Sequence, residues 1–209
     1  MSTEIITVDR ADPFAVAQTD KVTAFIPHGF GSVFKFAELI HASGMAPKDM
    51  NSPDKIAVTL FHGMEIGMTP MAALQSIAVI NNRPAVWGDG ALAMVRASGQ
   101  LEDIEEFYEG EFTKDGKPNP EFKAVCIVKR KGASRSVRNE FSIGDAQMAG
   151  LWTKSNTPWI TYPKRMLKMR ARSWAIRDEF TDIMRGLSIA EEVQDYDDMR
   201  DVTPAKEAP

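Results

Sequence analysis

The apolar positions in the first third of the chain repeat with the period of an α-helix. One series predicts a short helix that ends near residues 43–44: Val33, Phe36, Ala37 and Ile40. A second series predicts a helix that begins at Pro53 after a cap at Asn51-Ser52: Ile56, Leu60, Phe61 and Met64. Met68-Thr69-Pro70 begins another short helix, and residues 22–26 are expected to form a short strand.

The middle of the chain has the patterns of β-strands. Residues 77–87, IAVI-NN-RPAVW, predict a β-hairpin, because Asn tolerates the left-handed backbone that a two-residue turn requires. Pro84 would confine its strand to a sheet edge, since proline donates no ladder hydrogen bond. A helix is predicted over about 90–97. Three further stretches are expected to pair as an antiparallel sheet: 103–112, 121–130 and 135–141.

Helices return in the last third. Ser142 and Asp145 have the spacing of an N-cap and its reciprocal acid, which predicts a helix to about Ala149. After a loop over 151–161, Thr161 is expected to cap a long helix over about 162–178. A shorter helix near 180–193 would follow. The predicted fold class is therefore α+β: a small antiparallel sheet and a β-hairpin packed with helices, with a long basic helix near 162–178.

Length and composition indicate one soluble domain with tails. We expect an N-terminal arm over 1–32 that contacts other subunits, a single domain over 33–193, and an acidic, disordered tail over 194–209. No apolar run approaches the roughly 20 residues that span a bilayer, and the N-terminus lacks the pattern of a secretory signal. A cytoplasmic protein is expected, and the single cysteine, Cys126, is predicted to be a buried core residue.

Charge is distributed very unevenly along the chain. Residues 123–177 hold 13 Lys/Arg and 2 Asp/Glu, a balance of +11, whereas the other 154 residues hold 12 and 27, a balance of −15. Such a separation concentrates a positive field on one region, and a polyanion is the natural partner for it.

The most basic stretch is Trp152–Arg177, which has seven Lys/Arg and no Asp/Glu. At 100° per residue, four cations of the predicted helix fall within an arc of about 100°: Lys164, Arg165, Lys168 and Arg172. Arg170 and Arg177 point to the opposite side. An apolar stripe between the two basic faces is expected to pack on the sheet: Leu167, Ala171 and Trp174.

These residue types suit a phosphate backbone, because Arg offers a planar fork of donors and Lys a mobile point charge. Three aromatic residues beside the cluster have two open interpretations, base stacking or a place in the core: Trp152, Trp159 and Tyr162. The basic strand end Lys129-Arg130-Lys131, with Arg135 and Arg138, either extends the same surface or keeps a hairpin tip soluble.

Over about residues 52–193 the sequence resembles the Redβ/RecT family of phage single-strand annealing proteins. The resemblance depends mainly on Pro158-Trp159, then Pro163-Lys-Arg-Met-Leu167, then Arg177 and Phe180. Supporting motifs are Gly67-Met-Thr-Pro70, Val86-Trp-Gly-Asp-Gly90, Cys126-Ile-Val-Lys-Arg130 and the pair Glu191-Glu192.

The resemblance implies an α+β core, homo-oligomers in rings or helical filaments, and DNA held in a basic groove. Lys164, Arg165, Arg170 and Arg177 match the family's DNA-contacting positions. Arg170 stands where a Lys is familiar, and Met169 and Trp174 replace more polar residues. The full set expected to contact DNA is Lys129, Arg130, Lys154, Trp159, Tyr162, Lys164, Arg165, Lys168, Arg170, Arg172 and Arg177.

The expected function is ATP-independent binding of single-stranded DNA and annealing of complementary strands in phage-type recombination, with the annealed duplex as intermediate. The sequence contains no G-x-x-x-x-G-K-[ST] loop, and no catalytic residue, metal site or cofactor is expected. The resemblance also implies, as partners, a phage exonuclease and the host single-strand-binding protein. Two alternatives are a metal-dependent nuclease and a DNA-binding scaffold without annealing activity.

Overall fold

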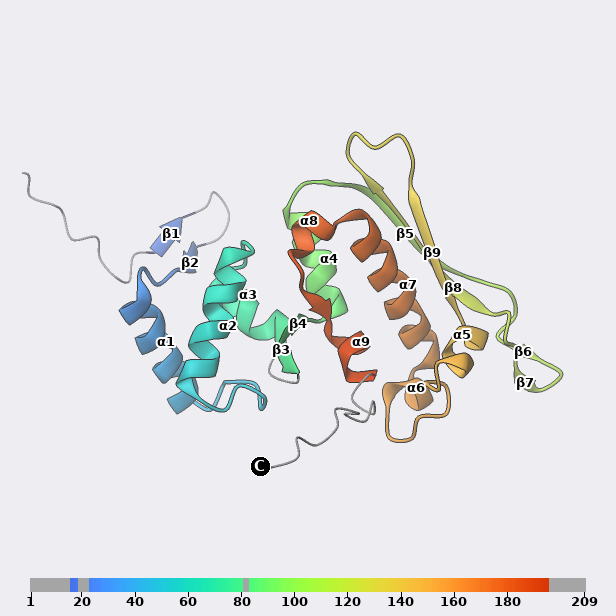
Figure 1. Ribbon diagram of the computed structural model, residues 1–209, viewed down its shortest axis with the longest axis horizontal. Helices are drawn as coiled ribbons and strands as arrows, with labels where there is room; N and C mark the ends of the chain where they lie inside the picture. The colour runs from blue at the N-terminus through green and yellow to red at the C-terminus, as the bar shows by residue number, and fades with distance from the viewer. Residues whose placement is uncertain (1–15, 19–22, 81–82, 196–209) are drawn as a thin grey trace, which may run out of the picture. The chain divides into compact units, whose positions relative to one another are not determined.

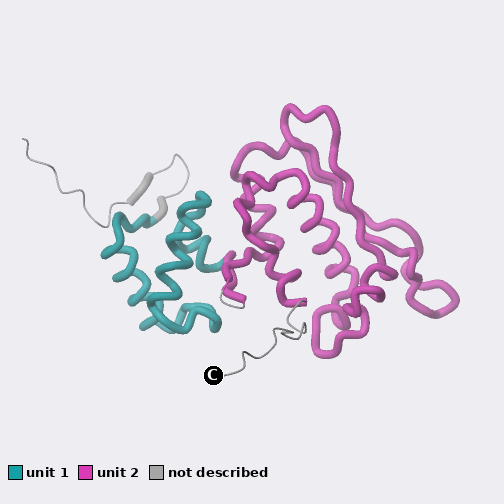
Figure 2. Tube along the Cα trace, viewed as in Figure 1, with its two compact units in different colours: residues 1–75 teal, residues 76–209 magenta. Residues whose placement is uncertain are grey.

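The computed structural model describes residues 16–18, 23–80 and 83–195. The chain divides into two compact units, 1–75 and 76–209, which Figure 2 distinguishes by colour. Both units contribute to the range 33–193 that the sequence indicated as one domain. Helices and small sheets alternate along the chain, which confirms the α+β class.

The first unit is mostly helical. Its elements are β1 (Val16–Gln18), β2 (Thr23–Phe25), α1 (Phe30–Ala42), α2 (Pro53–Glu65) and α3 (Pro70–Ser76), whose last residue already belongs to the second unit. The hydroxyl of Ser52 accepts a hydrogen bond from the backbone N–H of Lys55, so the predicted cap of α2 is confirmed. Val33 and Ala37 of α1 and Ile56 and Leu60 of α2 are fully or almost fully buried, as their spacing predicted.

The second unit carries the larger sheet. Its elements are β3 (Ile77–Ile80), β4 (Arg83–Val86), α4 (Gly88–Ala97), β5 (Leu101–Glu109), β6 (Thr113–Lys114), β7 (Lys117–Pro118), β8 (Lys123–Arg130), β9 (Val137–Ser142), α5 (Ile143–Met148), α6 (Pro158–Thr161), α7 (Pro163–Glu179), α8 (Thr181–Met184), β10 (Ser188–Ile189) and α9 (Ala190–Asp195). Figure 1 shows α7 lying along the sheet formed by β5, β8 and β9.

The sheet has the order β5-β8-β9, and both pairings are antiparallel, as predicted. Glu106 of β5, Cys126 of β8 and Asn139 of β9 lie opposite one another in register. Glu106 and Asn139 both bond to side chains of α7, so this row of the sheet faces the helix. Cys126 is fully buried there, which confirms the expectation for it.

Two tight local structures follow from turn and cap chemistry. The strands β6 and β7 are joined by Asp115 and Gly116, both with positive φ, as a two-residue hairpin turn requires. At the start of α5, the Ser142 hydroxyl accepts from the backbone N–H of Asp145, and the Asp145 carboxylate accepts from the N–H of Ser142. The predicted capping box is therefore confirmed.

The hairpin predicted over 77–87 is present, although one detail differs. Ile80 pairs with Arg83 in antiparallel register, while the predicted Asn81-Asn82 turn lies outside the described residues. The strand β4 is not an edge strand, because β10 pairs with it in parallel on its other side. This third strand is only two residues long and reaches Ala85 but not Pro84, so the proline disturbs no ladder hydrogen bond.

The end of the chain departs most from expectation. A single helix over 180–193 was predicted, but α8 ends at Met184, and β10 and α9 follow separately. Arg185 and Gly186 have φ values of 47° and 81°, a left-handed backbone that ends the helix and turns the chain toward β4. Gln194 and Asp195 belong to α9 and not to a disordered tail, and residues 196–209 lie outside the described residues.

Candidate nucleic-acid interface

The helix α7 is held on the sheet by its apolar stripe. Leu167 and Ala171 are fully buried, and the ring of Trp174 meets Phe141 of β9 edge to face at 5.1 Å between centroids. The predicted packing is confirmed for Leu167 and Ala171, while Trp174, 37% exposed, lies at the margin of the contact. The start of the helix differs from expectation: Tyr162, not Thr161, is the N-cap residue, because Thr161 ends the preceding turn of helix α6.

Arg172 lies beneath the basic face and not on it. Its guanidinium donates two hydrogen bonds of 2.7 Å to the two carboxylate oxygens of Glu106, and a third of 2.7 Å to Asp89 of α4. The residue is 5% exposed. Arg172 therefore joins the helix, the sheet and α4, and its charge is already neutralised inside the unit.

Arg165 shares the Asp89 carboxylate with Arg172 but lies at the surface. Its guanidinium donates to the other carboxylate oxygen at 3.0 Å, and its side chain is 59% exposed. Partial burial acts to raise the pKa of Asp89, but the hydrogen bonds and charges of Arg172 and Arg165 outweigh it and hold that pKa below its usual range. Asp89 thus has two cationic partners, the buried Arg172 and the exposed Arg165. Arg165 can leave Asp89 for another anion, because Arg172 stays bound to it.

Lys164 begins the exposed flank of α7. Its ammonium lies 4.7 Å from the ring centroid of Phe112 and 5.6 Å from that of Phe122, within the range of cation–π attraction. The Tyr108 hydroxyl donates a 3.1 Å hydrogen bond to the Lys164 carbonyl. These contacts fix the lysine beside the sheet while its side chain stays exposed.

Three further predicted residues are Tyr162, Lys168 and Lys154. Tyr162, directly before the helix, is 66% exposed. Lys168, one turn after Lys164, is half-buried, with its ammonium 3.9 Å from a Glu106 oxygen. Lys154 is half-buried in the loop before α6. The structure thus brings Tyr162, Lys164, Arg165 and Lys168 together at the N-terminal half of α7; we call these four residues the α7 patch.

The opposite side of α7 faces the acidic helix α9. Arg170, 4% exposed, forms a salt bridge with Asp195, and the indole N–H of Trp159 donates to the same carboxylate at 3.4 Å. Trp159 is 1% exposed and packs near Phe141. Neither side chain reaches the surface, so in this structure Trp159 has a core position and Arg170 an internal partner.

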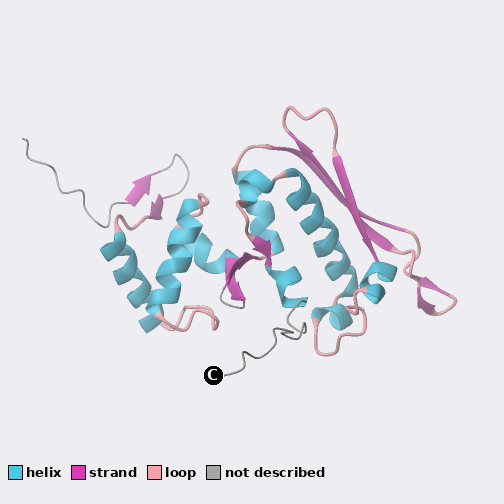
Figure 3. Cartoon of the chain, viewed as in Figure 1, coloured by secondary structure: helices cyan, strands magenta, loops and turns pink. Residues whose placement is uncertain are grey.

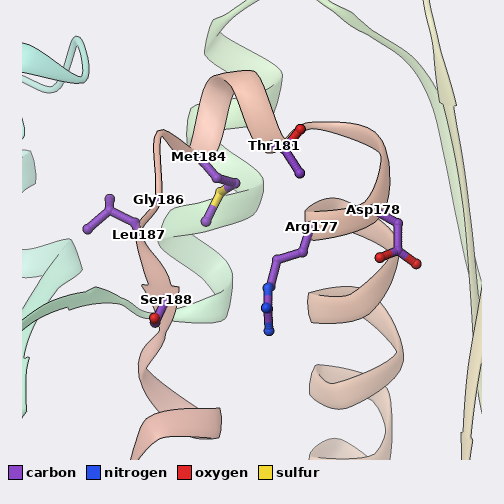
Figure 4. Close-up of a pocket in the computed structure, with 7 residues that line it drawn as sticks. All are labelled: Arg177, Asp178, Thr181, Met184, Gly186, Leu187 and Ser188. Atoms are coloured by element: carbon purple, nitrogen blue, oxygen red, sulfur yellow. The ribbon is translucent and has the colours of Figure 1, made fainter.

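Arg177, at the end of α7, is half-exposed and paired with the buried Glu192 of α9 at 2.5 Å. It lies beside a cavity of about 350 Å³ lined also by Asp178, Thr181, Met184, Leu187 and Ser188 (Figure 4). A second cavity of about 310 Å³ shares Arg177 and Ser188 and adds Arg83 and Glu192. Arg177 is therefore accessible, but from a different side of the helix than the α7 patch.

The basic end of β8 is bound internally. Lys129 pairs with Glu102 at 2.6 Å. Arg130 forms two hydrogen bonds of 2.7 Å with Asp182 and lies over the ring of Phe180. The hydrogen bond from Arg130 is the main reason that the pKa of Asp182 falls to about 2. Both cations serve contacts within the sheet and with α8.

Sequence reasoning missed the carboxylates that neutralise α7. Composition alone indicates no more than a solvated strand face for the acids of residues 102–111. The alternation in β5 contains the missing signal: Ile104, Glu106 and Tyr108 share one face, and an acid between two apolar residues on a core-facing row needs a cationic partner.

Comparison with known proteins gives no further information about this site. No known protein-family model matches the chain, and no curated protein sequence matches it. Within the described ranges, no group of three or more His, Cys, Asp or Glu residues is placed to hold a metal ion. No helix of the described part of the chain is both long and apolar enough to cross a membrane.

Proposed function

We propose that this protein binds single-stranded DNA and anneals complementary strands without ATP, in the cytoplasm of a bacterial host, as proteins of the Redβ/RecT family do. The observation that carries the proposal is the α7 patch. Two exposed cations, Lys164 and Arg165, follow an exposed aromatic residue, Tyr162, on a helix whose apolar stripe is packed on a sheet. Cations and an aromatic ring on rigid support are the elements of a single-strand binding surface.

The ion pairs of the patch are compatible with phosphate binding. An exposed salt bridge such as Arg165–Asp89 contributes only about 0–1 kcal/mol. When a phosphate takes the Arg165 guanidinium, Asp89 keeps its 2.7 Å bond to Arg172 and is not left unpaired. The exchange therefore costs little, and Arg172 acts as a positioning residue beneath the surface.

Tyr162 supplies the second element of recognition. Its ring is exposed at the start of α7, two positions before Lys164 in the chain, and a base of a strand bound by Lys164 or Arg165 can stack on it. Base–aromatic stacking is worth about 1–3 kcal/mol and depends little on sequence. A strand held by its phosphates and by sequence-independent stacking keeps its pairing edges available, which is the requirement for annealing.

Assembly and partners complete the proposal. Subunits form a homo-oligomer, a ring or a helical filament, on one strand, and pairing with the complementary strand provides the driving force within an annealed duplex intermediate. An exonuclease that produces the single strand and a host single-strand-binding protein that covers it are the proposed protein partners.

Binding is tested by fluorescence anisotropy with a labelled oligo-dT over a range of salt concentrations. Lys164→Ala/Arg165→Ala should weaken binding and lower the slope of log K against log salt by about 1.4, since each lost phosphate contact in single strands contributes about 0.7. The matched control is Lys48→Ala/Lys55→Ala, which removes two exposed cations from the first unit. Equal slopes for the two double variants would refute the α7 patch as the phosphate site.

A further inference from the structure

The sheet of the second unit has two open edges. In the order β5-β8-β9, β8 is paired on both sides, and no other strand of the described residues pairs with the outer side of β5 or β9. Figure 3 shows the three strands with helices on one face. An outer strand has a row of unpaired N–H and C=O groups, which is a template for pairing with another chain.

The edge formed by β5 is acidic. Its sequence LEDIEEFYE holds five acids and no cation. Asp103 and Glu105 are both exposed, and neither has an ion pair with another described residue. Two negative charges near the start of this strand are therefore available to a partner.

The opposite edge, formed by β9 and the turn before it, is basic. Lys131 and Arg135 in the turn are exposed and have no ion pair within the described ranges. Arg138 on the strand is already paired with Glu109 and Glu140. The turn thus provides two available positive charges at the start of β9.

These charges allow only one combination of edges. Two β5 edges repel each other, two β9 edges repel each other, and a β5 edge attracts a β9 edge. We propose that a second copy of this chain docks its β5 beside β9 of the first and extends the sheet from subunit to subunit.

The direction of pairing follows from the sheet itself. Both β5 and β9 run antiparallel to β8, so they run in the same direction, and a copy added in the same orientation pairs β5 with β9 in parallel. The start of β9 then lies near the start of the next β5. This brings Lys131 and Arg135 of one copy toward Asp103 and Glu105 of the next.

Such an interface is heterologous: each copy uses one edge and leaves the other free. Repetition closes into a ring or continues as a filament. Every copy keeps α7 on the same face of the extended sheet, so the α7 patch repeats along one side. The inference deepens the proposed function by naming the contact behind its homo-oligomer, and its test measures mass without DNA, so that assembly and annealing can fail separately.

The experiment uses two charge-reversed variants of the full chain. Asp103→Lys/Glu105→Lys gives a protein with two basic edges, and Lys131→Glu/Arg135→Glu gives one with two acidic edges. Analytical ultracentrifugation without DNA should find oligomers for the wild type, and self-association weaker by on the order of tenfold or more for each variant alone. An equimolar mixture should regain assembly, because each unlike pair of edges is restored.

The matched control for Asp103→Lys/Glu105→Lys is Glu38→Lys/Glu121→Lys, which makes the same change in net charge at exposed sites off both edges and should assemble like the wild type. Circular dichroism and thermal melting verify that each variant is folded. A monomeric wild type, assembly of either variant alone at wild-type strength, or folded variants that fail to associate when mixed would each overturn the edge-to-edge interface.

Discussion

Arg172 and Glu106 form a bidentate pair, with two hydrogen bonds of 2.7 Å between side chains that are 7% and 18% exposed. The pair joins the middle of α7 to β5, which gives the α7 patch a rigid base. Replacing Arg172 leaves the largely buried Glu106 with only the Lys168 ammonium at 3.9 Å, and removing one partner of a buried ion pair typically costs about 3–5 kcal/mol.

Arg172→Met should therefore lower the free energy of unfolding by about 3–5 kcal/mol in urea titrations. The double variant Arg172→Met/Glu106→Gln should be less destabilised than the single one, since it also removes the largely buried charge at Glu106. Arg165→Ala, whose salt bridge is exposed, should change stability by less than about 1 kcal/mol. If Arg165→Ala and Arg172→Met lowered the free energy of unfolding equally, the assignment of Arg165 to the surface and of Arg172 to the buried ion pair would be wrong.

The structure separates two aromatic residues that sequence spacing grouped together. Tyr162→Ala should weaken single-strand binding by about 1–3 kcal/mol and leave the melting temperature unchanged, because the ring is exposed. Trp159→Ala should instead lower stability by about 3–5 kcal/mol, because the ring fills the core. Anisotropy titrations and thermal melts check both results, and a stable Trp159→Ala protein with weak DNA binding would reverse the assignment.

The Arg130–Asp182 pair predicts an acid-sensitive component of stability. The carboxyl pKa falls from 3.8 to about 2, chiefly through the Arg130 hydrogen bond. For a lowered carboxyl pKa, the stabilisation is present above the unfolded value and disappears as the pH falls from about 4 to about 2. The stability difference between wild type and Asp182→Asn should therefore shrink over this range in urea titrations. A difference that stays constant from pH 5 to pH 2 would show that the charge of Asp182 contributes nothing to stability.

Cys126 should be unreactive in the folded protein. Burial, assisted by the charge of Glu106, raises the pKa of its thiol to about 12, so thiolate is scarce at pH 8. Labelling with a thiol-reactive disulfide reagent should be slow in native buffer and fast in urea, with a midpoint that coincides with unfolding. Rapid labelling of the native protein would place the thiol at an accessible site.

Local patterns gave the elements of this fold with good accuracy, because caps, turns and periodicity act between near neighbours in the chain. The capping box at Ser142 and Asp145 and the helix α2 after Ser52 are examples. The helix ends after Met184 at the left-handed Arg185-Gly186, whereas the formation of β10 depends on pairing with β4, about one hundred positions apart in sequence. Helical spacing alone could not indicate it.

The candidate site was predictable only in part for the same reason. Helical spacing correctly places four cations on one side of α7: Lys164, Arg165, Lys168 and Arg172. They differ in burial, because Lys164 and Arg165 are exposed, Lys168 is half-buried and Arg172 is buried. Arg172 is covered because Glu106, 66 positions away, lies opposite it on the sheet. Charge counts locate the basic segment, whereas long-range partners decide which of its cations reach the surface.

The most direct test of the proposed function is the annealing rate of complementary, dye-labelled oligonucleotides without nucleotide or metal. The wild type should accelerate annealing, and folded Lys164→Ala/Arg165→Ala should lose most of that acceleration, while Lys48→Ala/Lys55→Ala retains it. A wild-type protein that binds the strands but leaves their annealing rate unchanged would contradict the proposal and indicate a DNA-binding scaffold.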